Sequence, residues 1–335
     1  MKIGPVDIER DVLVVAEIGN NHEGDVALAE ELIGIAAEAG AQAVKFQTIT
    51  PEALVAPSQE ARLAQLRRYS ISSDDHQRLA QAADAAGVMF ISSPFSLAAI
   101  AMLDPLVPAF KVASGDNDFV PLLESIAATR KPILLSTGMA DLTMAARAKA
   151  AIECIWNEAA TDPGLVLLHC VSAYPTPIEE ANLAAIRSLA TLGRPVGYSD
   201  HTLGTSAATL SVGLGARVIE KHFTISKTHS DFRDHQLSAD PAELKELVMR
   251  IREANALLGD GIKRIMPAEQ VSATAARRSI AAAVDLPAGH IIGFGDLAWL
   301  RPGGGLAPGR ESKVLGRSLR RAVSAGHRFS SEDVS

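Results

Sequence analysis

The chain has 335 residues, of which 47% are hydrophobic, and its 32 basic and 39 acidic side chains give a formal net charge of −7. This length and apolar content predict one large domain and one small one. The acidic balance and the absence of a basic run exclude a nucleic-acid-binding surface, so an anionic ligand needs locally placed cations.

The cysteines and the N-terminal segment restrict the compartment. Cys154 and Cys170 are too few for a disulfide framework or a structural zinc site in a chain this long, and we expect both to be reduced and buried. The first residues carry charge where a secretion signal needs an apolar stretch, and no apolar run approaches the roughly 20 residues that span a bilayer. We therefore expect a cytoplasmic protein that does not enter a membrane.

Short apolar or β-branched runs alternate with Ala/Leu-rich stretches of helical periodicity along most of the chain. The runs lie at residues 12–19, 43–48, 88–95, 109–114, 133–138, 165–172, 195–201 and 216–224. Near-continuous apolar strands indicate a parallel sheet covered on both faces, and eight such units in about 250 residues match a (β/α)8 TIM barrel. A doubly wound open sheet is the alternative, but no G-x-G-x-x-G motif follows the first run.

The ends of this array are marked by two helical patterns. Residues 25–39 carry an apolar face and stop at Gly40, and residues 241–259 form the last strong amphipathic helix, with Pro241 in its first turn. We expect a barrel domain at residues 1–260, a linker at 261–277 and a small β-rich domain at 278–335.

The C-terminal segment contains a short internal repeat. Ala288-Gly289-His290-Ile291 is followed by Asp296-Leu297, and Ala325-Gly326-His327-Arg328 is followed by Asp333-Val334. The repeat predicts pseudo-symmetry, and coincidence between two glycine-centred turns is the alternative.

Polar side chains stand at the C-terminal end of every predicted strand, where TIM barrels carry their catalytic groups. They are Glu17, Lys45, Gln47, Ser92, Ser93, Lys111, Ser114, Ser136, Thr137, His169, Ser172, Tyr174, Ser199, Asp200, His201, Glu220 and His222. Because side chains alternate between the two faces of a strand, the members of several of these pairs can share one face. One polar strand end is more often a loop residue or a helix cap, but eight together predict an active site.

Two kinds of binding chemistry are indicated within this set. Lys45 and Lys111, with serine hydroxyls and backbone N–H groups near helix starts, would neutralise a small phosphorylated carboxylate, unless each lysine simply reaches from the barrel wall to water. His201 and His222 end neighbouring strands, and two neutral imidazoles can share a divalent ion that keeps open positions for substrate. His169 lies outside this pair, and we expect it to have a structural or supporting role.

Several segments resemble signature sequences of the sialic acid synthase family. They are EIGNNHEG at 17–24, ISSPFS at 91–96, LSTGM at 135–139, YPTP at 174–177, SDHT at 199–202 and EKHFT at 220–224. Residues 278–334, with the RPGGG segment at 301–305, resemble the antifreeze-like (SAF) domain, a β-clip fold, which follows the barrel in that family. The resemblance covers nearly the whole chain.

The resemblance implies a transferase that condenses phosphoenolpyruvate with an N-acetylated amino hexose, such as N-acetylmannosamine, and water. The products would be a nine-carbon 3-deoxy-2-ketoacid of the N-acetylneuraminate type and phosphate. It also implies a domain-swapped homodimer, in which the SAF domain of one subunit closes the barrel of the other and Arg301 reads the N-acetyl group.

The resemblance also assigns roles to the strand-end residues. Lys45, Lys111, Ser93, Ser114 and Ser136 would hold phosphoenolpyruvate, and His201 with His222 would hold a metal, Mn²⁺ in the first place and Mg²⁺ or Co²⁺ as alternatives. Glu17 would transfer a proton, and Glu220 would orient a metal-bound water. The remaining substrate contacts would be Gln47, Asp116, Ser172, Tyr174, Ser199 and Asp234.

Three departures from the family pattern fall on the sugar side. Phe232-Arg233 precedes Asp234-His235 where Gly-Pro is common, Asp116 replaces a usual glutamate, and Ser172 stands where the sialic-acid-forming branch has asparagine. Legionaminate-type, pseudaminate-type and spore-coat or surface-polysaccharide synthases are therefore alternatives, and Arg233 keeps a sugar-phosphate acceptor open. A non-catalytic sugar-binding protein is a further alternative, against which the intact set of costly polar groups argues.

Overall fold

The computed structural model describes all 335 residues and divides them into two compact units, Met1–Gly259 and Asp260–Ser335.

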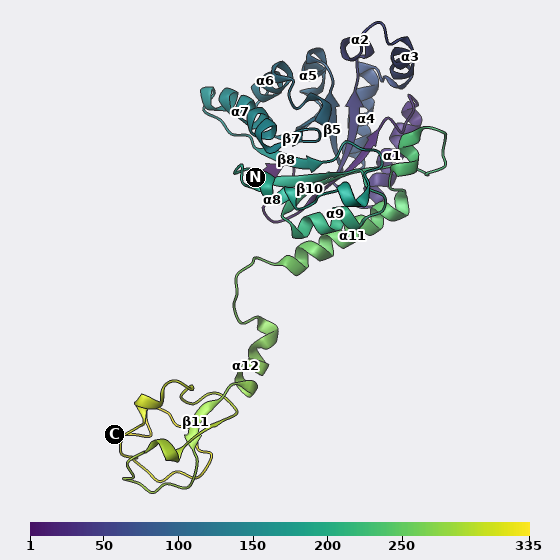
Figure 1. Cartoon of the computed structure of the whole chain (residues 1–335). Helices are drawn as coiled ribbons and strands as arrows, with labels where there is room; N and C mark the ends of the chain where they lie inside the picture. The colour runs from purple at the N-terminus through teal and green to yellow at the C-terminus, as the bar shows by residue number, and fades with distance from the viewer. The chain divides into compact units, whose positions relative to one another are not determined.

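Eight parallel strands form a closed barrel in the first unit (Figure 1). Neighbours in the sequence are neighbours in the barrel, and β10 closes it by pairing with β3. The strands are β3 (Leu13–Gly19), β4 (Ala43–Thr48), β5 (Met89–Pro94), β6 (Phe110–Val112), β7 (Ile133–Ser136), β8 (Leu165–Cys170), β9 (Val196–Asp200) and β10 (Ala216–His222). Each predicted apolar run contains one of them, so the TIM-barrel prediction is confirmed.

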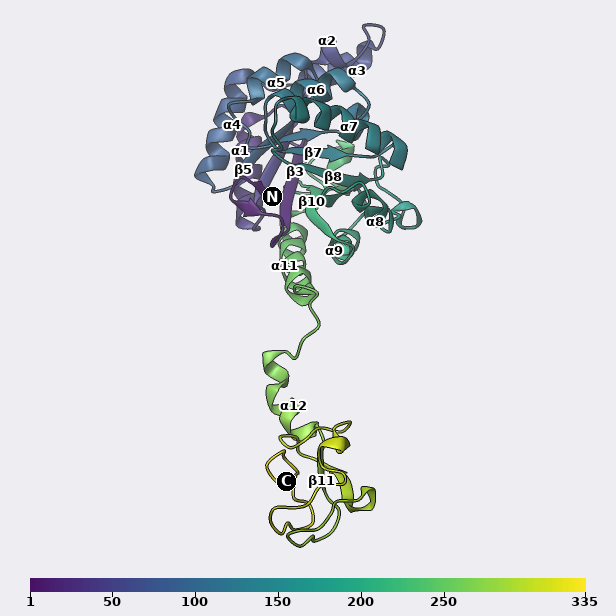
Figure 2. The same ribbon diagram turned by 90° about the vertical axis from the view of Figure 1, so that its left-hand side faces the viewer.

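Helices surround the strands (Figure 2). They are α1 (Val26–Glu38), α2 (Pro51–Leu54), α3 (Glu60–Tyr69), α4 (Ser73–Ala85), α5 (Leu97–Leu103), α6 (Val120–Ala128), α7 (Leu142–Glu158), α8 (Ala185–Ala190), α9 (Ser206–Gly213), α10 (Arg233–Leu237) and α11 (Pro241–Leu258). The two helices predicted at the ends of the array are α1, capped by the Asp25 carboxylate, and α11, which ends before Gly259 in a positive-φ conformation. None of the helices has both the length and the apolar character needed to cross a membrane.

The barrel strands bury both of their faces. Outward-facing side chains such as Phe46, Phe110 and Leu135 pack beneath the helices in one large cluster. Inward-facing side chains such as Val15, Ile91 and Val166 form a second cluster together with Ile3 of the short hairpin β1 (Lys2–Ile3) and β2 (Val6–Asp7). The lower part of the barrel interior is therefore closed by apolar packing, and polar side chains are left to the C-terminal strand ends.

The two cysteines differ in exposure. Cys170 is buried at the end of β8, but Cys154 is exposed on α7. The buried positions of α7 are Ala145, Ala148, Ile152 and Trp156, and this periodicity puts Cys154 on the outer face. The prediction of burial is therefore wrong for Cys154.

The second unit has a small apolar core. Strands β11 (Ser279–Ala282) and β12 (Leu297–Leu300) pair antiparallel, and buried side chains such as Ile280, Leu319 and Phe329 pack together. The segment that we expected to be a linker contains a 3-10 turn (Pro267–Glu269) and α12 (Gln270–Ala276). Short antiparallel pairing followed by turns is the β-rich organisation predicted for this region.

The internal repeat corresponds to paired hydrogen bonds in this unit. Leu286 and Val323 exchange both backbone bonds at 2.9 Å, and the glycines of the two motifs, Gly289 and Gly326, have φ values of 80° and 83°. Each motif also brings its histidine to its aspartate, at 2.7 Å for His290 with Asp296 and 3.1 Å for the second copy. The repeat is therefore a structural pseudo-symmetry.

Candidate active site

Charged side chains form the uppermost inward-facing layer of the barrel. Along the inner face of β3, Leu13 and Val15 are followed by Glu17, and the same alternation places Lys45, Lys111 and Glu220 on their own strands. These four side chains belong to residues that are only 1–4% exposed. The barrel thus holds two ammonium groups and two carboxyl groups away from water.

The four charged groups are in contact with one another. Lys45 Nζ lies 2.9 Å from Glu17 Oε2, and both lysine Nζ atoms lie 3.9 Å from Glu220 Oε2. Lys111 Nζ also donates hydrogen bonds to Ser136 Oγ at 2.6 Å and to the Val112 carbonyl at 2.8 Å, and Lys45 Nζ lies 3.4 Å from Ser93 Oγ. The serine hydroxyls and ammonium groups therefore form one polar surface that an anion can enter.

The surroundings separate the pKa values of the two carboxyl groups. Burial raises the pKa of Glu17, although Lys45 opposes this effect. Burial acts in the same direction on Glu220, but Lys111 and Lys45 outweigh it and lower the pKa of that carboxyl. Glu220 is thus the permanent anion of the cluster, and Glu17 is the carboxyl better placed to exchange a proton.

A glycine makes room for a pair of hydroxyl groups beside this cluster. The Gly138 N–H donates to Ser114 Oγ at 3.1 Å, and the Asn117 side chain holds the Gly138 carbonyl at 2.9 Å. A Cβ atom on Gly138 would lie 2.4 Å from Ser172 Oγ and 2.6 Å from Ser114 Oγ. The turn after β7 therefore brings Ser114 and Ser172 together only because residue 138 has no side chain.

The predicted metal ligands are neighbours in the structure. The rings of His201 and His222 have centroids 5.4 Å apart, and the Tyr174 ring lies 4.2 Å from that of His201. His201 Nδ1 lies 2.8 Å from the Val171 carbonyl and donates its proton there, which leaves Nε2 with a lone pair. His222 Nδ1 is buried without a protein partner. Two available nitrogen donors beside an anionic carboxyl fit a divalent ion.

Amide side chains extend the site toward the loop that follows β3. Gln47 Nε2 donates to Glu17 Oε1 at 3.0 Å, and Asn20 Nδ2 donates to Gln47 Oε1 at 3.0 Å. Gly19 has a φ of 55°, and a Cβ atom there would lie 3.1 Å from Glu17 Oε1. The sequence predicted Gln47 but not Asn20, because only the turn at Gly19 brings Asn20 to this position.

A cavity of about 780 Å³ adjoins these amides. Asn20 and Gln47 line it together with Arg62, Arg68 and Tyr69 of α3 and with Phe232, Arg233 and Asp234. The Phe232 and Tyr69 rings are 5.0 Å apart, and the Arg233 guanidinium lies 5.7 Å from the centre of the Tyr174 ring. Sequence reasoning missed the α3 wall, although the long interval between β4 and α4 was a usable signal.

Asp116 and Asp234, two acids predicted to contact the sugar, are partly buried. Burial raises the pKa of Asp234, against the effect of Arg233, and it also raises the pKa of Asp116, where Asp118 adds to the effect. Asp116 Oδ2 has no hydrogen-bond partner. Both carboxyl groups are therefore available to a ligand.

Comparison with known proteins identifies the family. The sequence model of the NeuB family matches residues 32–263, and that of the SAF domain matches residues 277–335. The chain belongs to the NeuB family. The resemblance to sialic acid synthases is thereby confirmed.

Relatives of this NeuB protein include sugar acid synthases. It is 40% identical over 328 residues to N,N'-diacetyllegionaminic acid synthase of Legionella pneumophila, across 93% of this chain and 92% of that one. It is 33% identical to pseudaminic acid synthase of Campylobacter jejuni, across 99% of both chains. The solved N-acetylneuraminic acid synthetase of Leptospira borgpetersenii superposes with a TM-score of 0.76 at 32% identity, across 81% of this chain and 94% of that one.

Three of the residues named from the sequence lie outside the cluster of charged groups and histidines. His169 Nε2 bonds the Ala181 carbonyl at 2.9 Å, which agrees with a structural role. Asp200 is paired with Lys221 at 2.9 Å, and this buried ion pair links β9 to β10. Arg301 belongs to the second unit, so its role at the barrel mouth stays a prediction.

Proposed function

We propose that this NeuB protein joins phosphoenolpyruvate to the aldehyde carbon of an N-acylated amino hexose, with water, to give a nine-carbon 3-deoxy-2-ketoacid and phosphate. The observation that carries the proposal is the buried cluster of Glu17, Lys45, Lys111 and Glu220 beside two available histidines. We propose a 2,4-diacetamido hexose of the legionaminate type as the first acceptor, because the 40% identity to a legionaminic acid synthase exceeds that to the solved neuraminic acid synthetase. N-acetylmannosamine, the acceptor that the sequence alone favoured, is the second.

The cluster suits phosphoenolpyruvate because the ligand supplies negative charge to two buried ammonium groups. The ion pair of Lys111 with Glu220 is long, at 3.9 Å, and the shorter contacts of the Lys111 ammonium are to the neutral oxygens of Val112 and Ser136. Burial lowers the pKa of Lys111, and a bound anion would offset this by favouring the charged amine. Ser93 and Ser136 would complete the phosphate contacts, and the paired hydroxyls beside Gly138 would face the substrate.

The proposed reaction makes one carbon–carbon bond and breaks one carbon–oxygen bond. The enol carbon attacks the sugar aldehyde, and water adds to the carbon that carried the phosphate. Glu17 would take the proton from that water, since its pKa is raised while Glu220 remains ionised. Phosphate then leaves with the bridging oxygen, and the carbonyl of the ketoacid forms.

We further propose that His201 and His222 hold a divalent ion, Mn²⁺ in the first place. When bound, such an ion would polarise the sugar aldehyde as a Lewis acid. Glu220, which accepts a hydrogen bond from Ser199 Oγ at 2.7 Å, would be held in place to orient groups beside the histidines. Gln47, Tyr174, Asp116, Asp234 and Ser172 would contact the sugar.

The second unit would act on a partner subunit. We propose a homodimer in which Arg301 of one chain reaches the acceptor in the other, as the family resemblance implies. Mixing inactive Arg301→Ala and Glu17→Gln chains tests this idea, because exchange of subunits would restore one intact site per mixed dimer. No recovery of activity from mixed dimers isolated through two different affinity tags would contradict it.

The function is tested by following phosphate release and product mass together. Metal-stripped protein is incubated with phosphoenolpyruvate and either acceptor, with and without Mn²⁺. Metal-dependent release with the 2,4-diacetamido hexose in preference to N-acetylmannosamine supports the proposal in full. Preference for N-acetylmannosamine would overturn the acceptor assignment, and no release with any amino hexose would favour the non-catalytic alternative.

A further inference from the structure

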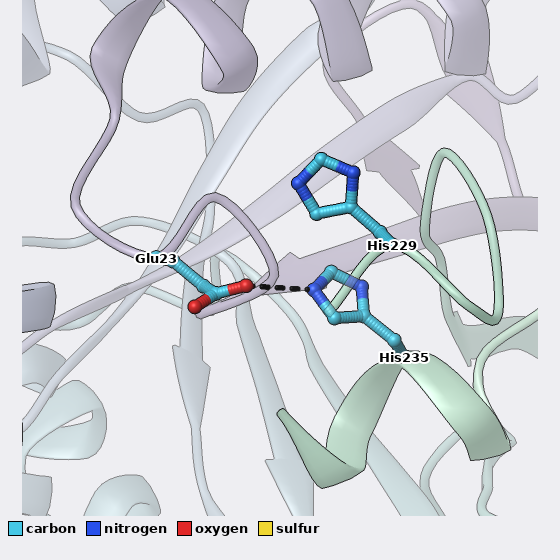
Figure 3. A group of neighbouring side chains, drawn as sticks. All are labelled: Glu23, His229 and His235. Carbon is cyan, nitrogen blue, oxygen red and sulfur yellow. Dashed lines mark hydrogen bonds and ion pairs between the residues drawn. The ribbon is translucent and has the colours of Figure 1, made fainter. Parts of the chain in front are cut away.

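A second group of metal-type ligands lies outside the strand-end set. Glu23 belongs to the loop between β3 and α1, His229 to the loop after β10, and His235 to α10 (Figure 3). The ligand atoms of the three side chains lie within 4.8 Å of one another. Glu23 Oε1 is 3.2 Å from His235 Nε2, and the two imidazole rings have centroids 5.2 Å apart. Two loops distant in sequence therefore meet through these side chains.

Polar contacts hold the His235 ring from both sides. Thr224 Oγ1 donates its proton to the Ser226 carbonyl at 3.1 Å. The same hydroxyl lies 2.6 Å from His235 Nδ1, so it can accept the Nδ1 proton when Nε2 binds an ion. On the other side of the ring, His235 Nε2 faces Glu23 Oε1 at 3.2 Å. This second-partner arrangement is how metal-bound histidines are usually held.

A histidine nitrogen and a carboxylate oxygen 3.2 Å apart can bind the same cation. Glu23 Oε1 already accepts a hydrogen bond from Ser230 Oγ, so its alignment with His235 is fixed from two sides. His235 is fully buried, so its ring is held at a fixed place beside this carboxylate. A divalent ion can take the place of the shared proton between Nε2 and Oε1 and bind both groups.

We propose that Glu23, His229 and His235 bind one Zn²⁺ ion or a similar transition-metal ion, separate from the ion at His201 and His222. Two imidazoles and one carboxylate are a zinc donor set that leaves a fourth position for water, and nitrogen donors disfavour Ca²⁺ and Mg²⁺. His229 is exposed, and its ligand atom lies within 4.8 Å of those of the other two side chains.

The ion would hold in place one wall of the 780 Å³ cavity described above. Glu23 lines that cavity, as do Ser230, Phe232 and Asp234, which stand between the two histidine ligands in sequence. Binding at both ends of residues 229–235 would hold this segment against the loop after β3. Its role is positional, because none of the three ligands belongs to the Glu17 and Lys45 cluster.

Zinc stoichiometry on the full-length chain tests the site without relying on activity. Metal-stripped protein is dialysed against micromolar Zn²⁺, and bound metal is counted per chain. We expect two ions in the unmodified protein and one in the His201→Ala, His222→Ala double variant. Adding His229→Ala to that double variant should weaken the remaining zinc binding by about 10–100-fold or more. Adding His290→Ala instead, at the histidine paired with Asp296, should leave it unchanged.

Two further measurements make the result decisive. Co²⁺ in place of Zn²⁺ should give the intense visible absorption of a low-coordinate site in the double variant, and Glu23→Gln should weaken it. Hydrogen exchange in residues 226–235 should slow on addition of Zn²⁺ in the double variant, but not when His229→Ala is also present. A double variant that binds no zinc, or one whose binding survives His229→Ala, would overturn the proposal, whatever reaction the enzyme performs.

Discussion

The two sides of the barrel mouth are built in different ways. On the proposed phosphoenolpyruvate side, Lys45, Lys111 and Glu220 project from strands, and these residues are at most 4% exposed. On the proposed acceptor side, Arg233 projects from the first turn of α10 with 69% of its side chain exposed, and the facing wall is helix α3. The barrel register fixes the first side, whereas loop conformation fixes the second. Changes on the first side should therefore alter chemistry, and changes on the second should alter acceptor binding.

The largest effect is expected from Glu17→Gln, which keeps the shape but removes the proton acceptor. We expect kcat to fall by about 10²–10⁴-fold, while KM for phosphoenolpyruvate changes little, because both lysines remain. Steady-state phosphate release measures both constants. Glu153→Gln, which alters an ion pair with Arg194 on the barrel exterior, is the matched control and should retain kcat. A Glu17→Gln enzyme with nearly normal kcat would remove Glu17 from the chemistry.

Gly138→Ala should give the next largest effect, at the point where Ser114, a proposed phosphoenolpyruvate contact, meets Ser172, a proposed sugar contact. The new methyl group would displace the Ser114 and Ser172 hydroxyls, since its Cβ would lie 2.6 and 2.4 Å from them. We expect destabilisation by about 1–3 kcal/mol and an increase in KM for phosphoenolpyruvate of roughly tenfold. Urea unfolding and steady-state kinetics measure the two effects.

Gly34→Ala is the control for that substitution. Gly34 lies within α1, and a Cβ atom there meets no other atom within 4 Å. We expect unchanged kinetics and a gain in stability of about 0.5–1 kcal/mol from helix propensity. Equal kinetic effects of the two substitutions would show that the hydroxyl pair beside Gly138 is unimportant for substrate binding.

Arg233→Ala should act on the acceptor alone. Its guanidinium lies over the Tyr174 ring at 5.7 Å, a contact worth about 0.5–1 kcal/mol at an exposed position. We expect KM for the amino sugar to rise by roughly two- to fivefold and KM for phosphoenolpyruvate to stay constant. Arg250→Ala, in an ion pair with Glu246 on α11, should change neither. A change in KM for phosphoenolpyruvate instead would contradict the assignment of Arg233 to the acceptor side.

The smallest expected effect concerns the pH response of Asp116. Burial raises the pKa of this carboxyl, and the negative charge of Asp118 raises it further. Asp118→Asn removes that like charge, so the pKa of Asp116 should fall by a few tenths of a unit and the carboxylate should persist to lower pH. Carboxyl-carbon NMR titration of the two proteins measures the shift, with Glu124→Gln as a control. A pKa that rises or stays constant would contradict the electrostatic account.

The same contrast explains what the sequence could predict. Near-continuous apolar runs located the eight strands, and the polar residues at their C-terminal ends included Glu17, Lys45 and Glu220. Nothing in the local pattern shows that α3 would face the Phe232–Asp234 segment, or that Glu23 would meet His229 and His235. Those contacts depend on loop paths across the barrel mouth, and Asn20 reaches Gln47 only through the positive-φ turn at Gly19.

The most direct test of the central claim follows the bridging oxygen of phosphoenolpyruvate. The enzyme is supplied with substrate labelled with ¹⁸O at that oxygen, a 2,4-diacetamido hexose and Mn²⁺, and both products are analysed by mass spectrometry. Condensation through water addition and carbon–oxygen cleavage predicts that the label appears in inorganic phosphate, together with a nine-carbon ketoacid that lacks it. Label retained in the ketoacid, or phosphate released without a ketoacid, would contradict the account.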